Sequence, residues 1–522
     1  MAKKKELPPN GQRPPSKLPR VVGVTRESDV TLGWVERDYP QLSVWRGLAV
    51  DWLKGETTAV SHKLNGLVAF LERYLIQLHL PLDPAVILAK ESVLPDFYRV
   101  ACPDSHKGVG YNNYIHAFLN FILLRDFSEI KDNDQRVVLP AFRNPISRLS
   151  VVGLPRREDA SVHSPLPYGY IEELRLILAA GPHFRDWHWA QGGLGEVAGL
   201  CGPGGPAWFE VTEDQIDRRD PDCVWRERFV NHKRRLEMWS PVRWVALLVK
   251  LILPLRTLQV RMLDSGEADT WRFDSGTWKV NEGPLAQGNE RKPNQQGIFR
   301  RSQITDSEGM SVVLYINTNK TADNAKCSYE KGYVLPWASS GLQHQNVFYW
   351  LEKLRNWQEK YNPISQRTSW TQLDSRHIKA KSALQLASYS DACFLFRLPE
   401  AKVTERHLPL TQDSLDKPWF NLLDALELRL ADRGETLSNG ESIRFLPLME
   451  QREPSSKKTL FPLHSLRVSL ITALALEGQV PFPILQKLVG HSRLLMTLYY
   501  TKPGAAYISD VLLHAVERLG KL

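Results

Sequence analysis

The stretch that constrains the fold most is residues 462–502, PLHSLRVSLITALALEGQVPFPILQKLVGHSRLLMTLYYTK. On a helix beginning near Leu463, His464 and Arg467 lie one turn apart and project to the same side. An adjacent side is apolar, as expected for a helix that packs on a core, and consists of Leu466, Leu470, Ala473 and Leu474. The pattern therefore predicts a buried helix with two polar groups at the edge of its buried face.

The residues after this helix predict a second, shorter one. A Glu-Gly pair ends the first helix, Pro483 suits the first turn of the next, and Gly490 stops it. His491 then emerges at a helix end, and Tyr500 follows nine residues later. Tyr499 stands beside Tyr500, and only the spacing from His491 distinguishes the two.

This series resembles the catalytic box of the tyrosine recombinases, the phage integrase family, whose pattern is H-x-x-R, then (L/V)GH, then T-x-x-Y. His464 and Arg467 match the first motif, Gly490 with His491 the second, and Thr497 with Tyr500 the third. Any one of these residues alone is typical of an ordinary core histidine or aromatic pair. Their joint occurrence at these spacings favours the resemblance.

The resemblance implies a further arginine upstream. An apolar helix predicted over residues 244–255 leads into Arg256 in the phrase LILPLRTLQVRMLD, where the family has G-L-R-x-x-E-L. This chain departs from that pattern, because Pro-Leu stands where the glycine would lie and Gln259 replaces the glutamate. Arg256 keeps the register of the family's arginine, and Arg261 is the competing choice.

The resemblance also implies a lysine in a β-hairpin. The strand-like runs 311–316 and 332–337 predict such a hairpin. Lys320 occupies the position that resembles the family's lysine, and Lys326 and Lys331 are its rivals.

The implied active site combines one nucleophile, two guanidiniums, two imidazoles and one lysine: Tyr500, Arg256, Arg467, His464, His491 and Lys320. A tyrosine hydroxyl with its ordinary pKa of about 10 needs nearby cations to become a nucleophile at neutral pH. Forked guanidiniums can offset the charge of a pentacoordinate phosphate, and imidazoles can donate or relay protons. The lysine would protonate the departing 5′ oxygen. The resemblance implies a 3′-phosphotyrosyl intermediate, which requires no ATP, metal or cofactor.

Composition limits the class of protein. At 522 residues the chain is too long for one ordinary core, so two or three domains are expected. An excess of 67 Lys and Arg over 58 Asp and Glu gives a net charge of +9, which favours an acidic partner. Five scattered cysteines favour a reducing cytoplasm over a disulfide framework. No apolar run reaches the roughly 18 residues of a membrane span, and the basic start lacks the apolar centre of a signal peptide.

The amino half is expected to be helical. Residues 1–38 predict a disordered basic arm, residues 39–139 a compact bundle of amphipathic helices, and residues 140–167 a linker. Tyrosine recombinases carry a helical, SAM-like core-binding domain before the catalytic domain. The resemblance therefore implies that the bundle is a DNA clamp and that residues 168–522 are catalytic, although the helices alone are typical of any small bundle.

Two segments depart from the compact family pattern and are expected to be insertions, over residues 181–239 and 275–309. The first carries cations that suit either a DNA-binding surface or an ordinary solvated face: Arg218, Arg219, Arg226, Arg228, Lys233, Arg234 and Arg235. Its possible metal ligands lack the spacing of a zinc site: His183, His188, Cys201, Cys223 and His232. Its Gly-rich loop is not followed by G-K-[ST], so it is no phosphate cradle. We therefore expect no metal.

Together these patterns predict a mainly α protein with a small antiparallel β-sheet. The expected function is site-specific recombination for a mobile element, by integration, excision or transposition. The alternatives are a type IB topoisomerase-like enzyme and a DNA-binding protein with a relict active site. The expected partners are a double-stranded DNA site, further copies of this chain in a dimer or tetramer on DNA, and accessory proteins, in the cytoplasm at the bacterial nucleoid. An apolar stripe predicts a last helix over residues 505–519, which docks on its own catalytic domain or on a neighbouring protomer.

Overall fold

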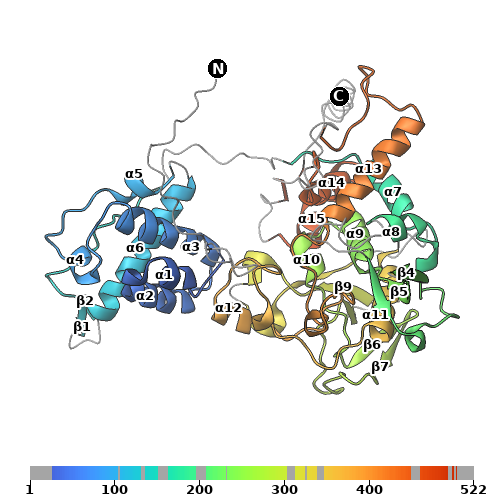
Figure 1. Ribbon diagram of the computed structural model, residues 1–522, viewed down its shortest axis with the longest axis horizontal. Helices are drawn as coiled ribbons and strands as arrows, with labels where there is room; N and C mark the ends of the chain where they lie inside the picture. Colours follow the sequence, from blue (N-terminus) through green and yellow to red (C-terminus); the bar gives the residue numbers. More distant parts are fainter. Residues whose placement is uncertain are drawn as a thin grey trace, which may run out of the picture. The chain divides into compact units, whose positions relative to one another are not determined.

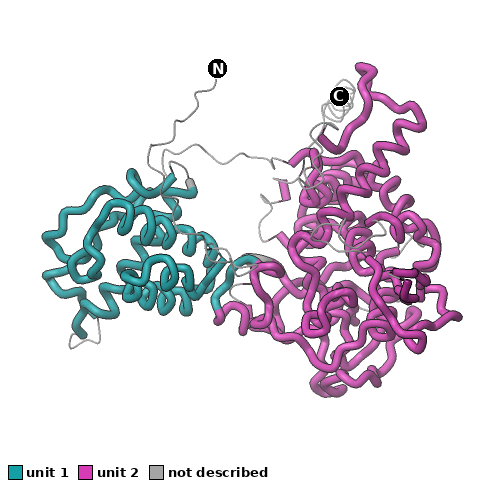
Figure 2. Tube along the Cα trace, in the orientation of Figure 1, with its two compact units in different colours: residues 1–154, 379–382 teal, residues 155–378, 383–522 magenta. Residues whose placement is uncertain are grey.

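A computed structural model of the protein describes residues 26, 28–103, 106–130, 136–150, 163–194, 207–230, 232–301, 312–323, 326–337, 346–447, 459–491, 497–498 and 501. The side chains at positions 106, 320 and 321 lie outside this description. The chain divides into two compact units (Figure 2). Unit 1 is Met1–Leu154 with Lys379–Ser382, and unit 2 is Pro155–Ile378 with Ala383–Leu522.

Unit 1 is a helical bundle with one small hairpin. Its elements are α1 (Gly33–Asp38), α2 (Ser43–Lys54), α3 (Val60–Val68), the π-helical turn η2 (Ala69–Ile76), α4 (Pro84–Leu88), α5 (Phe97–Ala101), α6 (His106–Asp126), β1 (Ser128–Ile130) and β2 (Arg136–Val138). Its core is aromatic: the Trp45 ring lies 5.2 Å from Phe70 and 6.2 Å from Phe118, between centroids. Such rings bury large areas and fix the helices that carry them.

The amino-terminal boundary differs from the sequence prediction. Trp34 and Val35 of α1 are buried in the core of unit 1. The predicted disordered arm over residues 1–38 is therefore wrong in its last part. Burying the two apolar side chains removes their surface from water, and this favourable free energy would be lost in a solvated arm.

Unit 2 is organised around α9 (Val242–Ile252), in which every residue is buried. Helices from distant parts of the chain pack on it (Figure 1): α7 (Tyr168–Leu178), α11 (Val347–Tyr361), α13 (Asp416–Asp432) and α14 (Leu463–Leu476). The next helix along the chain, α10 (Thr257–Arg261), also packs on it. A helix apolar on all sides is expected at the centre of a domain. Shorter helices complete the unit: α8 (His188–Gly192), α12 (Ala383–Ala387) and α15 (Phe482–Leu488).

Single 3₁₀ turns connect these elements. They are η1 (Pro40–Leu42) in unit 1 and, in unit 2, η3 (Phe184–Asp186), η5 (Glu213–Gln215), η6 (Lys320–Asp323), η7 (Ser328–Glu330), η9 (Trp370–Gln372) and η10 (Val403–Glu405).

The predicted hairpin belongs to a three-stranded antiparallel sheet of order β10-β9-β8. Its strands are β8 (Phe299–Arg301), β9 (Val312–Ile316) and β10 (Tyr333–Leu335). The hairpin prediction is confirmed, and the interpretation of residues 275–309 as a surface insertion is wrong at β8. Ile298 and Phe299 are buried in the main core, so this part of the segment completes the sheet. The same region also contains a two-stranded hairpin of β6 (Trp271–Asp274) and β7 (Thr277–Val280).

The segment over residues 181–239 shares the main core of unit 2. It contains a sheet of order β3-β5-β4, formed by β3 (Trp208–Val211), β4 (Trp225–Val230) and β5 (Lys233–Trp239). Trp187 packs against Trp350 of α11 with ring centroids 4.6 Å apart. The described residues are 44% helical and 13% strand, which confirms a mixed, mainly helical fold with small antiparallel sheets. The finer assignment of a core-binding and a catalytic domain stays a prediction.

Candidate active site

Arg467 of α14 is the most buried of the predicted site residues, with an exposed fraction of 0%. Its Nη1 donates to the carbonyl of Pro254, and its Nη2 donates to the carbonyl of Val489 at 3.0 Å. The same Nη2 lies 2.9 Å from Nε2 of His491. One guanidinium thus joins α14, the end of α15 and the segment that leads to Arg256.

His491 is held from both ring nitrogens. Because Arg467 donates to Nε2, the neutral imidazole carries its proton on Nδ1, which lies 3.0 Å from Oγ1 of Thr497. Burial, and then the charges of Arg467 and Arg256, lower the pKa of His491 to about 3. The ring is therefore neutral at physiological pH.

Gly490 is required by the backbone and by its neighbour. Its φ is +66°, and a Cβ at this position would lie 2.7 Å from Cε1 of Tyr333 in β10. A side chain here would strain the backbone and collide with a ring. The helix end that presents His491 is thereby packed directly on the sheet that contains the predicted hairpin.

Arg256 caps α10 and is tied to the same hairpin through Gln259. The backbone N–H of Arg256 donates to Oε1 of Gln259 at 2.9 Å, and Nε2 of Gln259 donates to the carbonyl of Thr318 at 3.1 Å. Nη1 of Arg256 is buried and has no hydrogen-bond partner among the residues that the structure describes. An unsatisfied buried guanidinium donor is costly, which is consistent with a binding site for an anion.

Arg261, the competing arginine, has a different environment. Its Nη1 donates to the carbonyls of His377 at 2.8 Å and Leu410 at 2.7 Å. These bonds connect three chain segments within the core, as expected for a structural arginine. Nε of Arg261, like Nη1 of Arg256, is buried without a hydrogen-bond partner among the described residues. The charge of Arg256, however, acts on Lys250, His464 and His491, so the geometry favours Arg256 over Arg261 for the site.

The hairpin loop lies beside the other residues of the site. Nδ2 of Asn319 donates to the carbonyl of Gly490 at 2.9 Å, which brings the start of η6, and the backbone of Lys320, next to His491. Lys326 donates to the carbonyl of Gly332 at 3.0 Å. Lys331 donates to two carbonyls of the loop, at 2.9 and 3.0 Å. Both rival lysines therefore bond within the hairpin itself.

Sequence reasoning missed Lys250, which lies on α9 with an exposed fraction of 0%. Its Nζ donates to the carbonyl of Leu255 at 2.7 Å. Burial, and then the charges of Arg467 and Arg256, lower its pKa from 10.5 to about 7. No carboxylate in the described part of the chain pairs with Lys250 or Arg256. A lone lysine in an apolar helix is typical of a solvent-facing position. The residues around Lys250 in the chain therefore carried no signal that it is buried.

His464 completes the group on the side of α14. Its ring meets that of His163 edge to face, with centroids 5.1 Å apart. Burial lowers the pKa of His464 to about 4, with further contributions from Lys250, His163 and the two arginines. The sequence offered no signal for His163, because the contact depends on the folding of residues 163–166 against α14.

The predicted nucleophile lies outside the described residues, as do Tyr499 and the predicted last helix over residues 505–519. The described residues on either side bond to one another. Thr501 donates through its N–H to the carbonyl of Leu498 at 3.0 Å and through Oγ1 to the carbonyl of Thr497 at 3.1 Å. Because Thr497 also contacts His491, the chain on both sides of Tyr500 is anchored next to the site.

The predicted DNA-binding cations lie on and around the β4–β5 hairpin, and five of the seven pair with carboxylates of their own sheet or its flanking turn. Arg226 and Arg228 pair with Glu237, Arg235 with Glu210, Arg218 with Glu213, and Arg234 with Glu227 and Glu213. Arg219 and Lys233 also belong to this region. Such pairing is typical of a solvated, charge-balanced face, so DNA contact by these residues stays a prediction.

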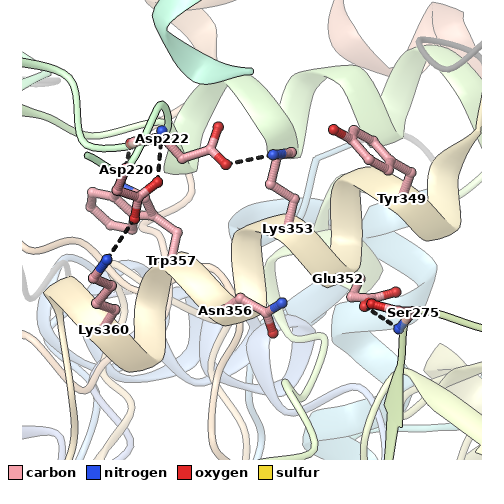
Figure 3. Close-up of a pocket in the computed structure, with 9 residues that line it drawn as sticks. All are labelled: Asp220, Asp222, Ser275, Tyr349, Glu352, Lys353, Asn356, Trp357 and Lys360. Atoms are coloured by element: carbon pink, nitrogen blue, oxygen red, sulfur yellow. Dashed lines mark hydrogen bonds and ion pairs between the residues drawn. The ribbon is translucent and has the colours of Figure 1, made fainter. Parts of the chain in front are cut away.

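Two other possible sites carry no comparable chemistry. Among the described residues no group of three or more His, Cys, Asp or Glu side chains could hold a metal ion, and Cys201 lies outside them. A cavity of about 290 Å³ beside α11 is lined by paired charges (Figure 3). There Lys353 pairs with Asp222, and Lys360 lies 2.8 Å from Asp220. Opposite charges cancel in that cavity, whereas the group around Arg256 and Lys250 is cationic.

A protein-family model described as "Putative integrase" matches residues 40–371 of the chain. The match covers well over half of the sequence, and the chain belongs to this integrase family. It includes Arg256 and the β9–β10 hairpin and ends before α14. No curated protein and no solved structure matches the chain. The family supports an integrase-like recombinase enzyme that acts on DNA. No helix in the described residues is long and apolar enough to cross a membrane.

Proposed function

We propose that the protein is a tyrosine recombinase that cuts and rejoins DNA strands of a mobile element through a 3′-phosphotyrosyl intermediate on Tyr500. The observation that supports this most is the pair of buried cations Arg256 and Arg467, with the Lys250 amine and two neutral imidazoles beside them. Isolated buried charges are expensive, so a cluster of one sign indicates an anionic ligand. A phosphodiester is the anion that an integrase handles.

The proposed roles follow from the contacts. Arg467 is fixed by two main-chain carbonyls and by His491, so its positive charge is preorganised beside the proposed phosphate position. Arg256 offers the buried Nη1 to a non-bridging oxygen. His464 and His491 are neutral, so they act by donating or accepting hydrogen bonds and not as permanent cations.

The leaving 5′ oxygen requires a proton, and Lys320 is the proposed donor. Its loop is linked to Gly490 through Asn319, which supports its place beside the scissile phosphate. Lys326 and Lys331 bond to carbonyls of the hairpin and are less suited to this role.

The assembly is also part of the proposal. Unit 1 would act as a helical clamp on double-stranded DNA, and protomers would assemble as dimers and tetramers on two recombination sites. Integration, excision and transposition share the same strand-transfer chemistry, so the proposal covers each of them.

A nicked suicide substrate tests this function. The duplex carries an end sequence of the element with a nick near the cleavage point, so that cutting releases a short strand and traps the enzyme on DNA. We expect a covalent adduct and, with a second site, joined product. Relaxation of supercoiled DNA with an adduct but no joined product would indicate a type IB topoisomerase-like enzyme. Absence of any adduct with duplexes from both element ends would contradict the proposal and favour a relict site.

A further inference from the structure

Lys250 is the least expected residue of the site. It is fully buried on the central helix α9, where all neighbouring residues of the helix are buried too. An ammonium has three donors and no acceptor, and among the residues that the structure describes it has one acceptor at hydrogen-bond distance, the carbonyl of Leu255. A buried lysine with a single neutral partner is unusual, since burial strongly disfavours its charged form.

The charged groups that act on Lys250 are cations. Arg467 from α14 and Arg256 from the following segment both disfavour its protonation, and His464 of α14 in turn responds to the charge of Lys250. The charged groups of the other helices around α9 have other partners. The buried arginines donate as follows: Arg175 of α7 to Leu251, Arg261 of α10 to His377 and Leu410, and Arg355 of α11 to Asn356. Glu427 of α13 is half-buried and accepts from the N–H groups of Phe445 and Leu446. The surroundings thus favour an uncharged amine.

We propose that Lys250 is mostly uncharged in the DNA-free protein at mildly alkaline pH and takes up a proton from solvent when a phosphodiester enters the site between Arg256 and Arg467. The inference rests on the proposed function for the source of that phosphate. No bond between heavy atoms changes: the nitrogen lone pair of the amine takes a proton from solvent and forms the third N–H bond of an ammonium, and the phosphate keeps its single negative charge. The added anion compensates the third cation, which the free site does not tolerate.

Lys250 would act as a positioning residue in both states. A neutral amine has two N–H groups and an ammonium three, so the bond to the Leu255 carbonyl persists. The preceding carbonyl, that of Pro254, accepts from Arg467. Lys250 and Arg467 thus hold the two carbonyls directly before Arg256, and they position Arg256 whether or not Lys250 is charged.

The sign of the pH dependence follows. The pKa of Lys250 in the free protein is lowered to about 7, so at pH 8 about a tenth of the molecules carry the proton. A bound anion raises that pKa. Anion binding between pH 7 and the higher bound value should therefore take up a proton and weaken as pH rises. His464 and His491 titrate several pH units lower and contribute little above pH 7.5.

The test is an NMR titration of the full chain labelled with ¹³Cε-lysine, with inorganic sulfate as the probe because sulfate does not titrate in this range. The Lys250 signal is assigned as the one that is absent from the spectrum of Lys250→Met. If that variant does not fold, Lys250→Arg serves the same purpose. We expect a midpoint near pH 7 in sodium chloride, and a midpoint at least about one pH unit higher in sodium sulfate of equal ionic strength. Arg256→Gln should reduce that difference.

Lys279 is the matched control, because it lies in unit 2, is exposed and pairs with Asp274. Its signal should be the same in both salts. An ordinary lysine titration for Lys250 in chloride, or equal midpoints in both salts, would overturn the inference. This test can fail separately from the proposed function. A covalent adduct on nicked DNA with no change of the Lys250 midpoint in sulfate would contradict only the coupling of anion binding to protonation. A higher midpoint in sulfate with no adduct would contradict only the recombinase chemistry.

Discussion

Replacing Gly490 by alanine tests how the helix end beside His491 is built. The new Cβ is unfavourable for two reasons. The backbone has a left-handed φ of +66°, and an atom of the Tyr333 ring lies only 2.7 Å from the Cβ position. The backbone term is about 1–2 kcal/mol, and forcing extra volume into a packed contact adds about 1–3 kcal/mol. Gly490→Ala should therefore lower the free energy of unfolding of unit 2 by about 2–5 kcal/mol, the sum of these terms.

Gly276 provides a matched control within unit 2. Its φ is +83°, and a Cβ there meets no atom within 4 Å. Gly276→Ala should cost only the backbone term of about 1–2 kcal/mol. The difference between the two variants isolates the contact with Tyr333, and adding Tyr333→Leu to Gly490→Ala should recover part of it, since the shorter side chain removes the ring.

The activity of Gly490→Ala should fall more than the loss of folded protein alone would explain. A displacement of about 1 Å at His491 would lower the rate of adduct formation about a hundredfold, whereas Gly276→Ala should leave that rate within about twofold of the parent. Urea unfolding and single-turnover adduct formation measure the two effects. Equal destabilisation by both variants, or an unchanged adduct rate in Gly490→Ala, would refute the reasoning about this contact.

Two further predictions concern the leaving group and the assembly. Lys320→Ala should cleave normal DNA poorly but recover on a substrate with sulfur in place of the 5′-bridging oxygen, because a thiolate leaves without a proton; rescue of Lys326→Ala or Lys331→Ala instead would move the donor within the hairpin. Removal of residues 506–522 should leave single-site DNA binding near normal while pairing of two sites and recombination fail, as read by native gels. Efficient recombination by the truncated protein would contradict docking on a neighbour, and insolubility would favour docking on the same chain.

The parts of the site set by short-range patterns could be predicted from the sequence. The stretch that carries His464 and Arg467 forms α14, the helix after it ends at Leu488, shortly before Gly490, and the strand-like runs form β9 and β10. In each case the apolar spacing and the glycine or proline signals act within a few residues.

The features that depend on distant contacts could not be predicted. Lys250 appears as a lone lysine in a largely apolar helix, and its burial follows from the helices that pack on α9, most of them from distant parts of the chain. The strand β8 has only three residues, and its pairing with β9 decides its structure. Gln259 departs from the glutamate of the family pattern, and only the fold reveals that it links Arg256 to the hairpin.

The most direct test of the central claim is to identify the residue that is bound to DNA. After trapping on nicked DNA and nuclease digestion, trypsin should release the peptide of residues 494–518, because the Lys502–Pro503 bond resists cleavage. Fragmentation should place the nucleotide on Tyr500, and Tyr500→Phe should form no adduct while DNA affinity changes little, since one hydroxyl adds little to many phosphate contacts. A nucleotide on Tyr499, or an adduct that persists in Tyr500→Phe and is lost in Tyr499→Phe, would contradict the account.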